Sequence, residues 1–178
     1  MELIVFNLPG LYNSGPQHWQ TYWENEYGFK RIEQNNWDEP VCDDWIKRID
    51  DAIALYPPDQ VILIGHSLAC CTIVKWAEKY KRIIKGTLLV APSDTEAPSY
   101  PGGTIGFTPM PAYRLPFPSL TIASTNDEYV SLERARFFAK NWGSELILTG
   151  AHGHINSASK LGNWPEGYEL LKTLMNLH

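Results

Sequence analysis

Cysteine is scarce in this chain, and the three cysteines that are present show no pairing pattern. Cys70 and Cys71 are adjacent and Cys42 is far from both, unlike the spaced cysteines of a disulfide framework. No Cys or His partners stand at the spacing of a zinc finger. We therefore expect buried thiols in a reducing compartment, and neither a disulfide nor a metal site.

The chain also lacks a basic block and a long apolar run. Its 15 basic and 20 acidic residues give a formal net charge of −5, and no Lys/Arg cluster marks the positive face that nucleic acid binding needs. The apolar stretches fall short of the ~20 residues that span a membrane, and the opening segment lacks the basic flank of a secretion signal. These absences predict a cytoplasmic protein that binds neither nucleic acid nor membrane.

What is present is the pattern of a globular protein with a central sheet. The 178 residues are 44% hydrophobic and 20% charged, which fits a single domain over 1–178 with a well-packed core. Short apolar runs rich in β-branched residues alternate with helical patterns, as in a parallel sheet covered on both faces. The expected strands are 3–8, 61–64, 87–90, 120–123 and 146–148, with a weaker candidate at 31–33.

Apolar residues at helical spacing predict the helices between these strands. The expected helices are 45–56, about 68–80, 132–142 after an N-cap at Ser131, and one that begins at Pro165. Right-handed crossovers between parallel strands then place helices on both faces of the sheet. The sequence therefore predicts an α/β fold with six parallel strands in the order 2-1-3-4-5-6.

Residues 91–118 interrupt this alternation. The segment holds more than half of the 13 prolines and several glycines, so that regular structure is not expected there. It leaves the carboxyl end of a sheet strand, where α/β proteins bind ligands. We expect it to form part of a substrate-pocket wall; a plain proline-rich connection is the alternative.

The sharpest local signal is Gly65-His66-Ser67-Leu68-Ala69, which lies between an apolar strand and a helix. A small-x-Ser-x-small turn at this place is a nucleophile elbow, whose small neighbours let the turn raise the serine hydroxyl into a cleft. The helix that follows directs its N-terminal N–H groups toward a developing oxyanion. Ser67 is therefore the candidate nucleophile, and a helix-capping serine is the alternative.

A carboxylate partner for Ser67 is expected at the carboxyl end of a later strand, because the chain order Ser, Asp, His is typical of this type of site. Asp127 follows the strand 120–123 and is the preferred acid. Asp94 follows the strand 87–90 and is its rival. Both positions stay open at this point.

A histidine base is expected in the glycine-bearing loop after the last strand. His154 is preferred because Gly153 allows a close approach to the elbow, and His152 is its rival. The remaining histidines have no comparable motif, and structural roles are expected for them; these are His18, His66 and His178.

Two backbone groups are candidates for an oxyanion hole. One is the Leu68 N–H, directly after the candidate nucleophile. The other is the Leu11 N–H, in the loop after the first strand, where the backbone turns back toward the elbow.

Together these motifs resemble the small serine hydrolase family that contains the retinoblastoma-binding protein 9 type and many bacterial esterases. The resemblance spans nearly the whole chain and implies a compact α/β-hydrolase fold that lacks the two leading antiparallel strands of larger relatives. From the length of the chain we expect no separate lid domain. It also places a catalytic triad on Ser67, Asp127 and His154. The motifs that carry it are Leu8-Pro9-Gly10 with Ser14, His18-Trp19-Gln20, Gly65-His66-Ser67-Leu68, Ala91-Pro92-Ser93-Asp94, Asn126-Asp127-Glu128-Tyr129-Val130, Trp142-Gly143-Ser144, Gly153-His154-Ile155-Asn156 and Trp164-Pro165-Glu166-Gly167.

The expected activity is hydrolysis of small carboxylic esters through an acyl-serine intermediate, which needs no metal or organic cofactor. The expected partner is a small acyl substrate. Two alternatives share the same residues: a catalytically weak module that binds a protein partner, and an acyltransferase or amidase that uses the same triad.

Overall fold

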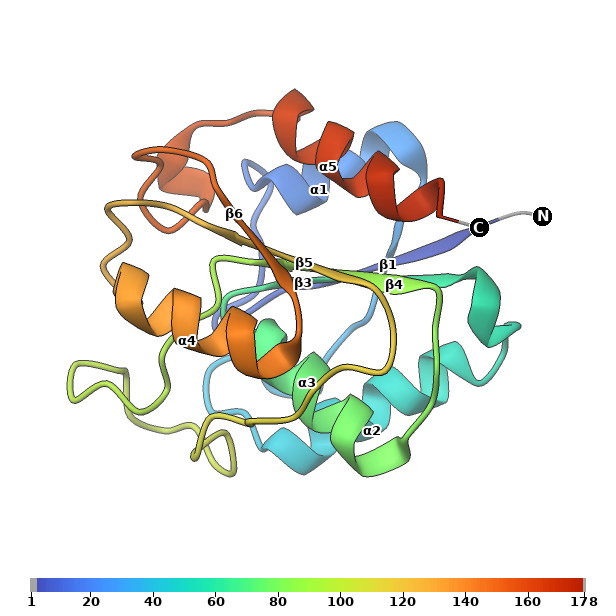
Figure 1. Ribbon diagram of the computed structural model, residues 1–178, viewed down its shortest axis with the longest axis horizontal. Coiled ribbons are helices and arrows are strands. Elements are labelled where there is room, and N and C mark those ends of the chain that lie inside the picture. The colour runs from blue at the N-terminus through green and yellow to red at the C-terminus, as the bar shows by residue number, and fades with distance from the viewer. Residues whose placement is uncertain (1–2, 178) are drawn as a thin grey trace.

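The structure, a computed structural model that describes residues 3–177, contains a six-stranded sheet (Figure 1). Its strand order is β2-β1-β3-β4-β5-β6, and every neighbouring pair is parallel. The predicted α/β class and strand order are confirmed. The strands are β1 (Ile4–Leu8), β2 (Lys30–Arg31), β3 (Val61–His66), β4 (Gly86–Val90), β5 (Ser119–Ala123) and β6 (Glu145–Leu148).

Within the described residues, five α-helices cover the sheet, with α1 and α5 on one face and α2, α3 and α4 on the other (Figure 1). Short 3₁₀ turns occur at Pro58–Gln60 and Ser157–Ser159. No helix within residues 3–177 is long and apolar enough to cross a membrane. The helices are α1 (Trp19–Tyr27), α2 (Cys42–Ile53), α3 (Leu68–Tyr80), α4 (Leu132–Trp142) and α5 (Pro165–Met175).

The two layers of helices enclose separate apolar cores, and β3 contributes to both. Val61 and Leu63 belong to the core beneath α2, α3 and α4, whereas Ile62 and Ile64 belong to the core beneath α1 and α5. Successive side chains of a strand point to opposite faces. An uninterrupted apolar run is therefore what a central strand with two covered faces requires.

The structure corrects several expected boundaries. Strand β2 spans Lys30–Arg31 instead of 31–33, and the helix expected over 45–56 runs from Cys42 to Ile53, before the Pro57-Pro58 pair. Helix α1 was not expected, because its N-cap is His18 instead of Ser, Thr, Asp or Asn. The imidazole takes over the capping role, since its Nδ1 accepts from the Gln20 N–H at 3.2 Å.

All three cysteines are buried and unpaired, as expected. Burial raises the pKa of each thiol above its ordinary value. The thiols of Cys42, Cys70 and Cys71 therefore stay protonated and serve as small apolar side chains.

The segment 91–118 contains no helix or strand, but it is fixed at three places. Near its start, the Asp94 carboxylate pairs with Arg134 of α4. In the middle, the Ile105 C=O accepts from the N–H of Cys42 in α2 at 2.9 Å. Near its end, the Leu115 N–H donates to the C=O of Trp142, the last residue of α4, at 2.9 Å. These three contacts hold the segment 91–118 in place against α2 and α4.

Candidate active site

Ser67 lies at the turn between β3 and α3 in a conformation that few residues adopt. Its φ is 57° and its ψ is −120°, and such a positive φ strains a residue with a Cβ by about 1–3 kcal/mol. The turn is tight because β3 packs directly on α3: a Cβ on Gly65 would lie 2.7 Å from Ile73 Cδ1 and 3.2 Å from the Ala69 carbonyl carbon. This geometry is that of a nucleophile elbow.

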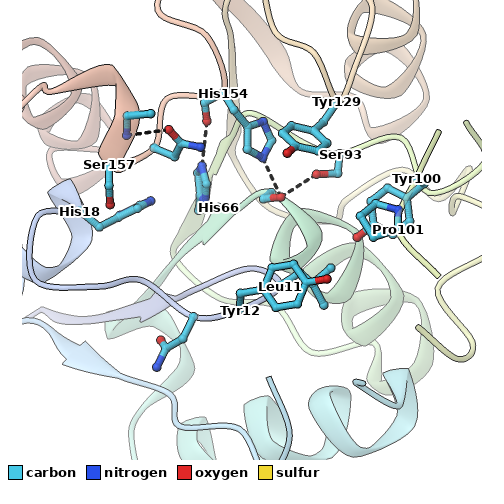
Figure 2. Close-up of a pocket in the computed structure, with 14 residues that line it drawn as sticks. Leu11, Tyr12, His18, His66, Ser93, Tyr100, Pro101, Tyr129, His154 and Ser157 are labelled. Atoms are coloured by element: carbon cyan, nitrogen blue, oxygen red, sulfur yellow. Dashed lines mark hydrogen bonds between the residues drawn. The ribbon is translucent and has the colours of Figure 1, made fainter. Parts of the chain in front are cut away.

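A continuous line of hydrogen bonds joins three side chains from three different loops. Ser67 Oγ lies 2.8 Å from His154 Nε2, and His154 Nδ1 lies 2.9 Å from Asp127 Oδ2 and 3.0 Å from Oδ1. Figure 2 shows the His154 ring directed at the elbow. Because Nδ1 donates to the carboxylate, Nε2 is free to accept the proton of the serine hydroxyl.

The imidazole of His154 is held from two sides. The Asp127 side chain is fully buried, and its Oδ1 also accepts from the Tyr129 N–H at 2.8 Å. The Tyr129 ring lies against the His154 ring with centroids 4.5 Å apart (Figure 2). One short turn after β5 thus orients the histidine by a carboxylate and by an aromatic face.

The two rival residues lie in other surroundings. The Asp94 carboxylate accepts from Arg134 Nε at 2.6 Å and from Arg134 Nη2 at 3.0 Å, so its oxygens are already engaged away from His154. His152 is exposed, and its backbone N–H donates to Ser124 Oγ at 2.9 Å. The structure brings neither residue into the line with Ser67.

Ser93 is a member of the site that the sequence did not single out for a role. Its Oγ lies 2.6 Å from Ser67 Oγ, and the residue is 2% exposed. With the Ser67 hydroxyl directed at His154, Ser93 is the donor of this bond. The available signal was its position just after β4, the neighbour of β3 in the sheet.

The loop after β1 lies directly against the elbow. A Cβ on Gly10 would be 2.8 Å from both Ser67 Cβ and the His66 carbonyl oxygen, and 3.2 Å from the Leu68 nitrogen. Neither the Leu11 nor the Leu68 N–H donates to a protein acceptor among residues 3–177. Two candidate oxyanion donors are therefore unpaired beside the serine.

Two further histidines, His66 and His18, are buried next to His154. His66 Nε2 lies 3.0 Å from the His154 carbonyl oxygen, to which it donates, and their rings are 5.0 Å apart. Burial, with the nearby His18 and His154, lowers the pKa of His66 well below 6.5. His66 therefore supports the loop of His154 as a neutral ring. His178 lies outside the described residues.

His18 has a structural contact and also faces the site. It is 3% exposed and caps α1, as the structural role expected from the sequence requires. It also lines the same cleft as Ser67 and His154. Burial, followed by the charges of Arg31 and His154, lowers the pKa of His18 to about 3.

The cleft above Ser67 has a volume of about 380 Å³ and is formed by the loops at the carboxyl ends of the strands. His18 and Ser157 lie at one end, and Tyr100 and Pro101 of the 91–118 segment lie at the other (Figure 2). Ser67 therefore lies between an end with His18 and Ser157 and an end with Tyr100 and Pro101.

Comparisons with known proteins show the family and the fold of this chain. The sequence profile of the serine hydrolase family matches residues 4–173. A YdeN-like hydrolase from Pectobacterium atrosepticum is 32% identical, with a TM-score of 0.86 over 97% of this chain and 90% of that chain. No curated protein sequence matches the chain.

More distant solved structures share the fold. The YdeN protein of Bacillus subtilis is 18% identical, with a TM-score of 0.81 over 98% of this chain and 100% of that one. Est1E from Butyrivibrio proteoclasticus is 13% identical, with a TM-score of 0.67 over 98% of this chain and 90% of that one. Since the family profile spans nearly all of the described residues, the chain belongs to the serine hydrolase family of the α/β-hydrolase superfamily.

Proposed function

We propose that this hydrolase cleaves carboxylic esters of small acyl groups through an acyl-serine intermediate, with Ser67 as nucleophile. The observation that supports this most directly is the unbroken hydrogen-bonded line from Ser67 through His154 to Asp127. A serine hydroxyl is a weak nucleophile unless a positioned base removes its proton. The substrate would be a small soluble ester in the cytoplasm, bound without nucleic acid or membrane.

In the acylation step, His154 Nε2 takes the proton of Ser67 while Oγ forms a bond to the ester carbonyl carbon. The carbonyl oxygen becomes an oxyanion that accepts from the Leu11 and Leu68 N–H groups. As the intermediate collapses, the bond to the alcohol oxygen breaks and His154 gives its proton to that oxygen. Asp127 stabilises the imidazolium meanwhile.

In the deacylation step, water takes the place of the alcohol. His154 removes a proton from the water, whose oxygen bonds to the acyl carbon. The Ser67 oxygen then leaves with the proton from His154, which releases the acid and restores the enzyme. Ser93 donates to Ser67 Oγ in the resting state. This hydrogen bond orients the Ser67 hydroxyl so that its own proton points to His154.

Labelling with a fluorophosphonate tests the nucleophile, because only an activated serine reacts with this probe. We expect the label on Ser67 by peptide mapping and no labelling of Ser67→Ala. Ser67→Ala should also lower kcat for 4-nitrophenyl butyrate by a factor on the order of 10⁶. Ser131→Ala is the matched control, since Ser131 caps α4 at an exposed position and should keep both activities. Label on another residue, or turnover by Ser67→Ala, contradicts the proposal.

A further inference from the structure

The orientation of His18 fixes which of its ring nitrogens carries the proton. Nδ1 accepts from the backbone N–H of Gln20 at the start of α1. A neutral imidazole that accepts through one nitrogen donates through the other. The proton of His18 therefore lies on Nε2.

This Nε2–H has no hydrogen-bond acceptor among the protein atoms of residues 3–177, although the side chain is almost completely buried. Buried donors are rarely left unpaired, because the loss of hydration is not compensated. The residue lines the same cleft as Ser67, and Figure 2 shows its ring extending toward His66, beside the His154 loop. An acceptor supplied by a bound molecule would satisfy this group, once a small shift of the neighbouring side chains opens Nε2 to the cleft.

The surroundings of His18 indicate an uncharged acceptor. The ring is neutral over the whole working range of pH, because burial lowers its pKa to about 3, so it offers no positive charge to a carboxylate. The guanidinium of Arg31 is already paired with Glu24 at 2.9 Å. An ionised ligand group would lose its hydration here without a counter-charge, whereas a ketone, amide or ester oxygen loses less.

We propose that His18 is a specificity-determining residue that donates a hydrogen bond from Nε2 to a second, uncharged carbonyl oxygen of the substrate. This inference rests on the proposed ester hydrolysis at Ser67 and names the class of ester that fits. His18 and Ser157 lie at one end of the cleft, opposite Tyr100 and Pro101 (Figure 2). The preferred substrates carry a ketone or amide in one of the two groups that flank the scissile ester.

Two substitutions separate the capping contact of His18 from its free donor. In His18→Asn the shorter amide reaches the position of Nδ1, and asparagine is a strong N-cap residue, so the helix contact is kept and the donor is lost. In His18→Gln the longer amide reaches the position of Nε2, so the donor is kept and the cap is lost. His18→Asn should therefore keep the stability and lose the substrate preference, whereas His18→Gln should keep the substrate preference and lose stability.

The probes are pairs of esters that differ only in a carbonyl oxygen. In the acyl series, 4-nitrophenyl esters of 3-oxo, 4-oxo and 5-oxo acids are each matched to the acid with a methyl branch in place of the oxygen. In the alcohol series, 3-oxobutyl butyrate is matched to 3-methylbutyl butyrate. The readout is the ratio of kcat/KM within each pair at pH 7.5, together with the thermal midpoint of each variant.

We expect wild type to prefer the oxo member of at least one pair. His18→Asn should reduce that preference about 10-fold, which is the effect of one hydrogen bond of ordinary net strength, while its thermal midpoint stays near that of wild type. His18→Gln should keep most of the preference and lose stability. The inference is overturned if the kcat/KM ratio is unchanged in both variants. It is also overturned if the ratio falls in each variant in proportion to the loss of thermal midpoint.

Failure of this inference is distinguishable from failure of the proposed hydrolase function. If wild type cleaves both members of every pair with equal kcat/KM and Ser67→Ala cleaves neither, the hydrolase function stands and only the role of His18 is refuted. If wild type is not labelled by the fluorophosphonate and cleaves no ester, the hydrolase function itself is refuted.

Discussion

Single residues at the site differ in how far the sequence could assign them. Ser67 was assignable because the elbow needs its neighbours in the chain, Gly65 and Ala69, which are visible in the sequence. The sequence favoured Asp127 over Asp94 but could not exclude Asp94, because both follow strands that end at the same edge of the sheet. What separates them is Arg134, which is 40 residues from Asp94 in the chain and engages its carboxylate.

Replacement of the two aspartates tests this distinction. Asp127→Asn should lower kcat for 4-nitrophenyl butyrate by a factor on the order of 10⁴, because the amide no longer holds His154 in the tautomer that accepts at Nε2. Asp94→Asn should leave kcat near that of wild type and lower the free energy of unfolding by about 1.5–3 kcal/mol, since a buried carboxylate that accepts twice from Arg134 loses its charge. The opposite pattern of kcat values would make Asp94 the acid.

Ser93→Ala tests the hydroxyl that donates to the nucleophile. We expect kcat/KM to fall about 10-fold, the effect of one lost hydrogen bond, because Ser67 Oγ loses a partner at 2.6 Å. Ser99→Ala is the control, as Ser99 is an exposed serine of the same segment. Equal kcat/KM values for the two variants would assign Ser93 to packing alone.

At the scale of secondary structure, strong periodicity made most elements predictable and weak periodicity concealed the rest. Helices α3 and α4 carry regular apolar faces and clear boundaries. Helix α1 buries Trp19, Trp23 and the polar Gln20, which is not a pattern of apolar residues alone. Strand β2 has only two residues, too few for a period. Elements held mainly by contacts with distant segments cannot be read from local sequence.

The loop between β1 and α1 offers a test in which two glycines are compared. Gly10→Ala would bring a methyl group to 2.8 Å from Ser67 Cβ and from a backbone oxygen of the elbow. The loop must then retreat and carry the Leu11 N–H with it, so we expect kcat to fall about 10²–10³-fold, as for a lost oxyanion donor. Gly15→Ala has no atom within 4 Å of its added Cβ and should keep wild-type kcat. Full activity of a folded Gly10→Ala enzyme would remove Leu11 from the mechanism.

At the scale of the whole molecule, the buried histidines make stability depend on pH. Burial holds the pKa of His18 at about 3 and that of His66 well below 6.5, whereas in the unfolded chain both are near 6.5. Below pH 6.5 the unfolded chain binds more protons than the folded protein. The contribution of these neutral rings to the free energy of unfolding is therefore fully present above pH 6.5, and it is lost as the pH falls toward 3.

We expect the free energy of unfolding to fall by about 1.4 kcal/mol per pH unit below pH 6 through His18, and His66 adds a loss in the same direction. Urea unfolding at pH 7, 6 and 5 measures this slope. His18→Asn removes one titrating group and should flatten the slope by about 1.4 kcal/mol per pH unit. Identical slopes for wild type and His18→Asn would mean that His18 titrates normally in the folded state.

The attachment of residues 91–118 to α2 and α4 also determines how a molecule enters the cleft. Arg134 fixes the start of the segment, Cys42 its middle and Trp142 its end, so the rim that contains Tyr100 cannot swing aside without breaking contacts to both helices. Admission then depends on the width of the incoming molecule and not on a lid that opens over microseconds to milliseconds. For the proposed ester hydrolysis, we therefore expect this rim to exclude bulky esters and to admit small ones without a lid movement.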